Sequence, residues 1–255
     1  MKTVFITGAA SGIGLMTAKL FAKQGYFVGL YDINNDVIET QLASGEFPNA
    51  CGCYCDVSNA ESVQEALKHF TKHTEGKINI LINNAGVLTS GFFEEIQAKQ
   101  HESMIDVNIK GVTTVAQLAY PYLKATPNSL LVNTCSASSI HGIPYLAVYS
   151  ASKFYVDGLS EALSIEWQTD DIRVISIKPP VIDTAMGASL HPNLTKNMPI
   201  EFSSEDVAQF IFNTINGNKT SYIIDFKTKA WVFINRFLSA GARMKLVKYL
   251  CSFEK

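Results

Sequence analysis

Long apolar runs, a strong net charge and abundant cysteine are all missing from this 255-residue chain. No uninterrupted stretch of about 18 apolar residues occurs, so a membrane-spanning helix is not expected. The 21 Lys and Arg residues nearly balance the 23 Asp and Glu residues, which argues against a partner with a nucleic-acid backbone. The five Cys are few and odd in number, and the first residues lack the basic start and long apolar core of a secretory signal. We therefore expect a cytoplasmic protein without disulfides and without a nucleic-acid partner.

Strand-like and helix-like segments alternate along the first 225 residues. This alternation is typical of repeated βαβ units. We predict seven strands, at 3–7, 27–31, 50–55, 78–82, 130–134, 174–177 and 222–225, and helices at 12–24, 35–43, 59–73, 101–125, 147–168 and 204–216. The expected fold is α/β, a Rossmann-type, doubly wound, seven-stranded parallel sheet with helices on both faces. No linker is visible, so we expect a single domain over 1–255, with a core at 1–225 and a tail at 226–255.

A glycine-rich loop follows the first predicted strand, and its candidate cofactor contacts are Gly8, Ser11, Gly12, Ile13 and Gly14. Glycines at a strand–helix junction let the backbone approach a pyrophosphate, and the helix start offers free N–H groups. The spacing Gly-x-x-x-Gly-x-Gly differs from the commoner Gly-x-Gly-x-x-Gly. Asp32, after the second strand, is placed to accept hydrogen bonds from both ribose hydroxyls and to repel a 2′-phosphate. Since Ser11 and Ile33 supply no positive charge, we expect NAD(H) rather than NADP(H).

Tyr149 and Lys153 lie four residues apart in a predicted helix and so share one face. A fixed ammonium favours the charged form of a phenol, which would bring the pKa of Tyr149 toward a useful range for proton transfer. Ser136 ends a strand at the same sheet edge as the glycine loop. Its hydroxyl is placed to meet the phenol and to stabilise charge on a substrate oxygen. On its own, a Tyr and Lys pair of this spacing more often marks a solvated helix face.

These elements together resemble the short-chain dehydrogenase/reductase family in its form of about 250 residues. The likeness covers residues 1–225 and rests on TGAASGIG at 7–14, Asp32, Asp56 with Val57, the Asn-Asn-Ala-Gly motif at 83–86, Asn108, Ser136, and Tyr149 with Lys153. The resemblance implies that Tyr149 is the acid/base, Ser136 binds the substrate oxygen, Lys153 holds the nicotinamide ribose and lowers the pKa of Tyr149, and Asn108 supports a proton-relaying water. It also implies cofactor contacts from Asp56, Val57, Asn83, Ala85, Gly86, Pro179, Ile182 and Thr184, and a homodimer or homotetramer formed through the two long helices.

The segment 179–203 departs from the family at its start, where Pro179-Pro180 replaces the usual Pro-Gly. Proline fixes φ and removes an N–H, so the backbone beneath the nicotinamide is expected to shift. The same segment is long and proline-rich and follows a strand end, which favours a mobile substrate lid.

Apolar residues dominate the predicted substrate loops. We expect substrate contacts from Ser136, Ile143, Tyr145 and Met186, with Leu88, Phe92, Phe93, Leu190, Leu194 and Met198 as further lining. The three Arg of the chain lie outside these loops, which argues against a carboxylate or phosphate clamp. The interpretation is an NAD(H)-dependent oxidoreductase that interconverts a secondary alcohol and a carbonyl on a hydrophobic, lipid-like or steroid-like molecule. The alternatives are a catalytically silent NAD-binding sensor, a carbonyl reductase using NADPH, and an epimerase or dehydratase of longer-chain relatives.

Two other patterns suggest metal ligands. Cys51, Cys53 and Cys55 alternate along a strand, and His69 and His73 lie four apart on a helix. Taken separately, the first set reads as small buried side chains and the second as a solvated helix face, so no metal is expected.

The tail has seven basic residues and one acidic residue over 227–255. Phe233, Phe237, Ala240, Met244, Val247 and Cys251 recur at helical spacing and predict a C-terminal amphipathic helix. Packing over the substrate cleft or at a subunit contact is the favoured role, and peripheral contact with an anionic membrane surface is the alternative.

Overall fold

The computed structural model describes residues 1–197, 200–235 and 237–253. A seven-stranded, all-parallel sheet forms its centre, in the order β3-β2-β1-β4-β5-β6-β9. The strands are β1 (Thr3–Thr7), β2 (Phe27–Asp32), β3 (Ala50–Tyr54), β4 (Ile80–Asn83), β5 (Ser129–Thr134), β6 (Ile172–Lys178) and β9 (Ser221–Ile223). All seven predicted strands are therefore confirmed, with ends shifted by one or two residues. The strand order reverses between β1 and β4, which is where open α/β sheets bind ligands.

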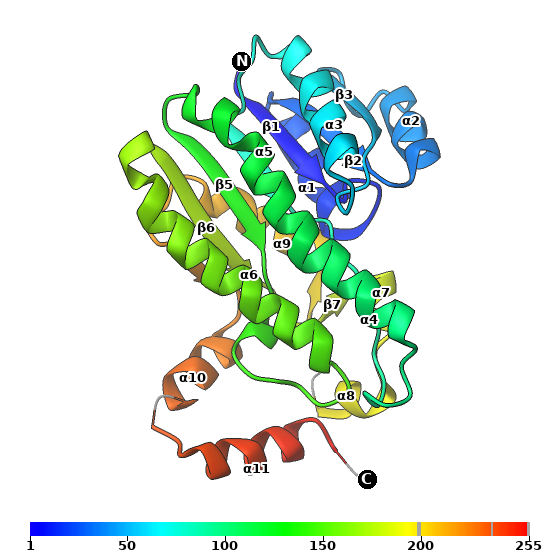
Figure 1. The fold of residues 1–255 in the computed structure, drawn as a ribbon, viewed down its shortest axis with the longest axis vertical. Coiled ribbons are helices and arrows are strands. Elements are labelled where there is room, and N and C mark those ends of the chain that lie inside the picture. The colour runs from blue at the N-terminus through cyan, green and yellow to red at the C-terminus, as the bar shows by residue number, and fades with distance from the viewer. Residues whose placement is uncertain (198–199, 236, 254–255) are drawn as a thin grey trace.

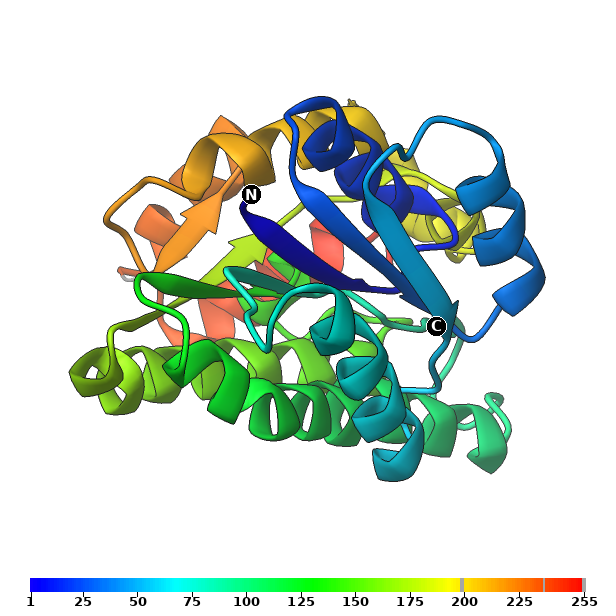
Figure 2. The same cartoon turned by 90° about the horizontal axis from the view of Figure 1, so that it is seen from above.

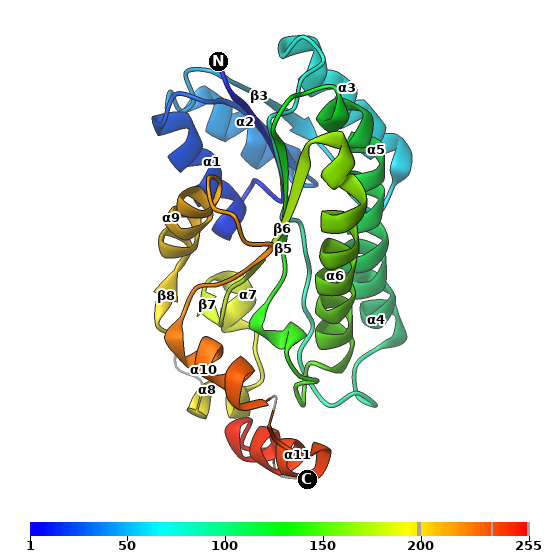
Figure 3. The same ribbon diagram turned by 90° about the vertical axis from the view of Figure 1, so that its left-hand side faces the viewer.

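Helices cover both faces of the sheet (Figures 1 and 2). On one side lie α1 (Gly12–Lys23), α2 (Asn35–Ala43) and α9 (Ser204–Thr214), and on the other lie α3 (Ala60–His73), α5 (Val112–Lys124) and α6 (Ala147–Glu166), as Figure 3 shows. Each layer has its own apolar core, because alternate strand residues point to opposite faces. Val4 and Ile6 of β1 pack toward α1 and α9, whereas Phe5 packs toward α3 and α5. The predicted doubly wound fold is confirmed.

The predicted helix at 101–125 is built from three pieces. It starts earlier, with α4 (Ala98–Ile105), passes through a π-helical turn at Asp106–Gly111, and continues as α5. A π turn inserts one extra residue per turn and often marks a functional position. Here the turn carries Asn108.

The segment 179–203, expected as a lid loop, contains four short elements. These are β7 (Ile182–Asp183), α7 (Ala185–Ala188), α8 (Pro192–Asn197) and β8 (Phe202–Ser203). Strands β7 and β8 pair with each other in a separate two-stranded sheet, so the segment starts and ends at the same place. Met198 and Pro199 lie outside the described residues.

The tail differs from the single amphipathic helix that the sequence predicted. It forms two helices, α10 (Phe226–Asn235) and α11 (Ala240–Leu250), at one end of the molecule (Figure 1). The expected stripe is divided between them, because the chain turns before Ser239 caps α11. Val247 and Cys251 are buried against the body, whereas Phe233, Phe237 and Met244 are exposed. Among the described helices, none is long and apolar enough to cross a membrane.

Candidate active site

A cleft of about 1220 Å³ opens at the carboxyl edge of the sheet. It begins at the glycine loop after β1, passes the ends of β4 and β5, and continues beneath the segment 179–203 and the tail helices. Single ligand pockets usually measure about 300–1,000 Å³. The cleft is therefore large enough for a dinucleotide together with a second molecule.

The glycine loop is shaped by backbone geometry that side chains would obstruct. Gly8 and Gly12 have φ values of 67° and 52°, in the left-handed region that glycine adopts without strain. A Cβ on Gly14 would lie 1.9 Å from the Gly8 carbonyl oxygen, so only glycine fits where α1 meets the loop. Ser11 precedes α1 without capping it through its side chain, which leaves the helix N-terminus available to an anion. Gly8, Ser11, Gly12 and Ile13 line the cleft, and Gly14 lies beneath it.

Asn84 holds the glycine loop in place. Its Nδ2 donates to the carbonyls of Thr7 and Gly8, at 3.1 and 3.2 Å, and its backbone amide donates to Thr7 Oγ1. A cofactor contact from Asn83 stays a prediction. Its side chain is buried away from the cleft and donates to the Val112 carbonyl at 2.9 Å, because strand alternation turns it toward α5.

Asp32 lines the same part of the cleft as the glycine loop. Its Oδ2 accepts from the Ala10 amide at 3.1 Å and its Oδ1 from the Asn34 amide at 3.0 Å. Each carboxylate oxygen has a further lone pair for a ribose hydroxyl. Asp56, Val57, Ala85 and Gly86 line the same part of the cleft, as the resemblance implied. The residues present thus fit a nicotinamide dinucleotide.

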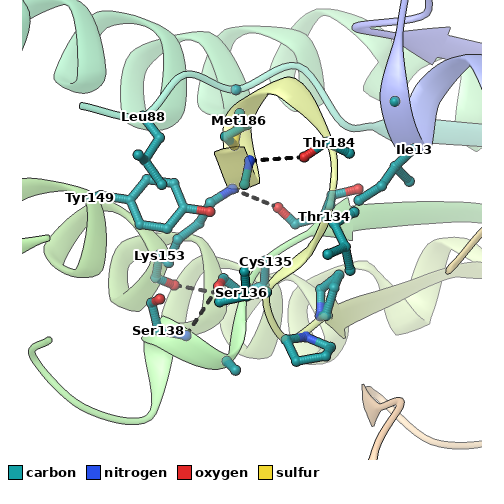
Figure 4. A pocket seen from close by; sticks show the side chains of 18 of the residues that line it. Ile13, Leu88, Thr134, Cys135, Ser136, Ser138, Tyr149, Lys153, Thr184 and Met186 are labelled. Atoms are coloured by element: carbon teal, nitrogen blue, oxygen red, sulfur yellow. Dashed lines mark hydrogen bonds between the residues drawn. The ribbon is translucent and has the colours of Figure 1, made fainter. Parts of the chain in front are cut away.

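Ser136, Tyr149 and Lys153 meet at the middle of the cleft, with Thr134 and Leu88 around them (Figure 4). Lys153 Nζ donates to the Thr134 carbonyl at 2.9 Å and lies 5.6 Å from the centre of the Tyr149 ring. Ser136 Oγ accepts from the Ser138 amide at 3.1 Å, which leaves its own hydrogen for the Tyr149 phenol or for a substrate oxygen. These contacts fix the ammonium and the hydroxyl beside the phenol.

Burial controls the proton affinities of this group. It raises the pKa of Tyr149 to about 12, against the opposing effect of the Ser136 hydroxyl. Burial also lowers the pKa of Lys153 from its usual value. Both shifts favour the neutral forms, as expected when charge leaves water. Lowering of the Tyr149 pKa by Lys153 stays a prediction.

Asn108 lies behind the cleft instead of lining it. Its Oδ1 accepts from the Val87 amide at 2.9 Å, and its Nδ2 donates to the Val87 carbonyl at 2.8 Å and to Ser152 Oγ at 3.2 Å. The side chain is fully buried. It therefore connects the loop after β4 to α6, which carries Tyr149. The water relay stays a prediction.

The Pro179-Pro180 step borders the nicotinamide side of the cleft. The Pro179 carbonyl accepts from the Ala137 amide at 2.9 Å, which ties this segment to the turn after Ser136. Ile182 and Thr184 line the cleft as expected. Thr184 Oγ1 also accepts from the Gly187 amide at 3.0 Å and caps α7.

The remaining compartment is apolar. Ile143 and Met186 line it as predicted, together with Leu88, Leu190 and Leu194. Tyr145 is not among the residues that line it: its ring is buried against His191 at a centroid distance of 4.0 Å and its hydroxyl accepts from Asn193 Nδ2. A substrate contact from Tyr145 stays a prediction. Phe92 packs behind the compartment and Phe93 is exposed beside His101.

The tail closes this compartment, as the favoured packing alternative proposed. Trp231 and Ile234 of α10 and Val247, Leu250 and Cys251 of the α11 region line it. Val247 and Cys251 belong to the same apolar cluster as Tyr149 and Leu194. Of these five, the sequence pattern singled out only Val247 and Cys251. His141, which also lines the cleft, carried no motif at all.

A parallel Rossmann-type sheet, a glycine loop at its switch point and a buried Ser, Tyr and Lys at one cleft define an oxidoreductase that uses a nicotinamide dinucleotide. The family model for short chain dehydrogenases matches residues 2–195, and the chain belongs to this family.

Relatives and solved structures agree with this assignment. The chain is 31% identical to an uncharacterized oxidoreductase of Staphylococcus aureus over 218 residues, which are 86% of this chain and 92% of the relative. It is 32% identical to the 3-oxoacyl-acyl-carrier-protein reductase of Thermotoga maritima, over 74% of this chain and 77% of that protein. The fold matches a 3-ketoacyl-acyl-carrier-protein reductase of Brucella melitensis complexed with NADH, with a TM-score of 0.79 and 25% identity over 88% of this chain and 96% of that one. It also matches an alcohol dehydrogenase of Thermococcus sibiricus complexed with 5-hydroxy-NADP, with a TM-score of 0.77 and 27% identity over 88% and 95%.

Proposed function

We propose that this protein interconverts a secondary alcohol and a carbonyl on a hydrophobic, lipid-like or steroid-like molecule, with NAD(H) as cofactor. The observation that carries the proposal is the position of Tyr149. Its phenol stands where the dinucleotide part of the cleft meets the apolar compartment under the tail.

The chain's own groups bind, orient and move a proton. In the reducing direction the Tyr149 hydroxyl donates its proton to the substrate oxygen, and in the oxidising direction the phenolate takes it back. The Ser136 hydroxyl donates a hydrogen bond to the same oxygen. Lys153, held by the Thr134 carbonyl, supplies positive charge beside the phenol. The dinucleotide, when bound, supplies or accepts the hydride.

Replacing Tyr149 by Phe tests this function. We expect turnover to fall by about 10²–10⁴-fold, the usual contribution of a positioned acid/base, while NADH affinity measured by fluorescence is retained. Tyr155→Phe is the matched control, because Tyr155 lies on the same helix with its hydroxyl bonded to Thr113 outside the cleft. Full activity of Tyr149→Phe would refute the assignment of Tyr149 as the acid/base. A wild-type protein that turns over none of a broad panel of alcohols and ketones would favour the silent NAD-binding sensor.

The preference for NAD(H) rests on Asp32. A carboxylate at the ribose end attracts hydroxyls and repels a 2′-phosphate, and the neighbouring Ile33 is exposed and uncharged. We expect kcat/KM to be at least tenfold higher with NADH than with NADPH. The double variant Asp32→Ser with Ile33→Arg is expected to reverse this ratio, and a wild-type preference for NADPH would select the carbonyl-reductase alternative.

The compartment indicates one further property of the substrate. Nε2 of the buried His141 has no hydrogen-bond partner in the described part of the chain. Burial lowers the pKa of His141, which keeps the ring neutral. We expect the preferred substrate to carry a polar group at the end away from the reacting carbon. Comparison of kcat/KM for pairs of alcohols that differ only in this polar group tests the expectation.

We further propose that the protein contacts anionic membrane surfaces peripherally through the tail and forms a homodimer or homotetramer through the long helices. Exposed Phe226, Phe233, Phe237 and Met244 together with basic residues support the membrane contact. Exposed Phe154, Tyr155 and Ile165 on α6 support assembly. Light scattering after size-exclusion chromatography measures the oligomer, and a monomer would rule it out.

A further inference from the structure

The two patterns that the sequence treated separately meet in space. Cys51 on β3 and His69 and His73 on α3 each offer one ligand atom, and these atoms all lie within 4.8 Å of one another. Cys51 is buried, His69 half-buried and His73 exposed. None of the three lines the active-site cleft, whose lining includes Cys55, just after β3 ends at Tyr54. The cluster is thus separate from the dinucleotide site.

Tyr31 orients the cluster from below. Its hydroxyl lies 2.9 Å from His69 Nδ1 and 3.6 Å from Cys51 Sγ. Its ring is fully buried and stacked on Phe5 with centroids 4.2 Å apart, so the hydroxyl is fixed in place. The His73 ring stacks on Phe27. It also lies edge-to-face with the His69 ring, with ring centroids 5.3 Å apart. Hydrogen bonds and ring contacts of this kind hold metal-binding side chains in position.

The donor set has a definite chemical preference. One thiolate and two imidazoles suit Zn²⁺ and similar borderline-soft ions, whereas Mg²⁺ and Ca²⁺ require oxygen ligands. With bonds of about 2.0–2.3 Å in a tetrahedron, ligand atoms would stand about 3.3–3.7 Å apart. Binding therefore needs the ligand atoms that stand farthest apart to approach by about 1 Å. A water molecule would complete the fourth position on the exposed side.

We propose that Cys51, His69 and His73 bind a zinc-class cation that joins β3 to α3. On binding, the Cys51 S–H bond breaks, a sulfur–metal bond forms, and the proton leaves to solvent. Because the chain offers three ligands and His73 is exposed, we expect reversible binding instead of a permanently filled structural site.

Titration of the reduced, cofactor-free protein with Zn²⁺, followed by calorimetry and thermal unfolding, tests the site. We expect one Zn²⁺ per chain and a rise in Tm, because a ligand that binds only the folded state stabilises it. Co²⁺ in place of Zn²⁺ is expected to give a thiolate-to-metal charge-transfer band. These readouts do not depend on turnover.

Matched variants identify the ligands. Cys51→Ser and His73→Asn are expected to weaken Zn²⁺ binding at least tenfold and to abolish the Co²⁺ band, while Cys53→Ser keeps both. His73 is exposed, so its variant leaves the fold intact even where Cys51→Ser does not. Tyr31→Phe is expected to weaken binding by about 10–100-fold, the usual effect of losing such a partner. Binding that is absent in the wild type, or equal in His73→Asn and the wild type, overturns the proposal.

Discussion

Tyr149 combines two opposing influences on one hydroxyl. Burial raises its pKa to about 12, and the Ser136 hydroxyl acts in the other direction. At neutral pH the phenol is therefore protonated, which is the form needed to donate a proton to a carbonyl. The reverse reaction needs the phenolate. At pH values below the pKa, the phenolate population rises about tenfold for each unit by which the pH is increased. At the residue scale, the direction of the reaction is thus coupled to pH.

This coupling predicts different pH profiles for the two directions. We expect kcat/KM for alcohol oxidation to rise between pH 7 and 10, and kcat/KM for carbonyl reduction not to rise over the same interval, since the acid form is already dominant there. Initial rates in both directions, in buffers of constant ionic strength, measure this. An oxidation rate that is already flat from pH 6 upward would contradict it.

Single residues show what a sequence can and cannot predict. Asp32, Ser136, Tyr149 and Lys153 were predicted because each has a fixed position relative to a strand end or helix face, and all four line the cleft. The side-chain directions of Asn83 and Tyr145 were not predictable, because they depend on neighbours. One is turned toward Val112 by the strand, and the other is held by His191. The convergence of Cys51 with His69 and His73 likewise depends on how α3 lies over β3.

At the element scale, the π turn at Asp106–Gly111 is the feature that hydrophobic periodicity missed. Helical spacing alone does not distinguish a π turn within a longer helix, so the sequence predicted one helix over 101–125. For the same reason the sequence predicted one helix in the tail, where the structure has two. The core strands were predicted more closely, because buried parallel strands read as short apolar runs.

The π turn places Asn108 where it bonds both Val87 and Ser152, and this arrangement predicts a coupled loss. Asn108→Ala would leave the Val87 amide and carbonyl and Ser152 without this partner, at a cost of about 1–3 kcal/mol for each buried group left unsatisfied. We expect a lower urea midpoint and a reduced kcat with little change in NADH affinity.

Asn108→Asp separates positioning from simple stability. Its oxygens can still accept from the Val87 amide, whereas the two donations to Val87 and Ser152 are lost. We expect stability below that of Asn108→Ala, because a buried carboxylate then faces the Val87 carbonyl, so a kcat above that of Asn108→Ala would be a positioning effect that stability does not explain. An Asn108→Ala protein with wild-type kcat would show that the link to α6 does not position Tyr149.

At the scale of the whole molecule, the tail gives the protein two unlike ends. It carries seven of the 21 basic residues and one of the 23 acidic residues over 227–255. Its exposed side has Phe226, Phe233, Phe237 and Met244, which are 63–82% exposed. Its inner side closes the apolar compartment beside Tyr149. An apolar substrate dissolved in a bilayer would meet the protein at the end where its cleft is covered by α10 and α11.

This asymmetry predicts binding to anionic vesicles. We expect the full-length protein to sediment with vesicles containing phosphatidylserine and not with phosphatidylcholine alone, and the binding to weaken as salt is raised, since each basic side chain near such a surface contributes about 1 kcal/mol that salt screens. Phe233→Ser with Phe237→Ser removes apolar contact, and Lys245→Gln with Lys248→Gln removes charge. Either pair is expected to reduce the bound fraction while NADH binding persists.

The matched control lies on another surface. Tyr54→Ser removes an exposed aromatic from β3, outside the tail and the proposed subunit interface, and is expected to leave vesicle binding unchanged. Point variants are preferable to deletion of the tail, because Val247 and Cys251 pack in the same cluster as Tyr149, and their loss would open the cleft. Equal sedimentation of both tail variants and the wild type would leave α10 and α11 with a single role, as the wall of the substrate compartment. A different result would be a loss of sedimentation with a KM that is raised for substrate carried in vesicles but not for substrate in solution. That result would show that α10 and α11 also bring the substrate from the membrane to the cleft.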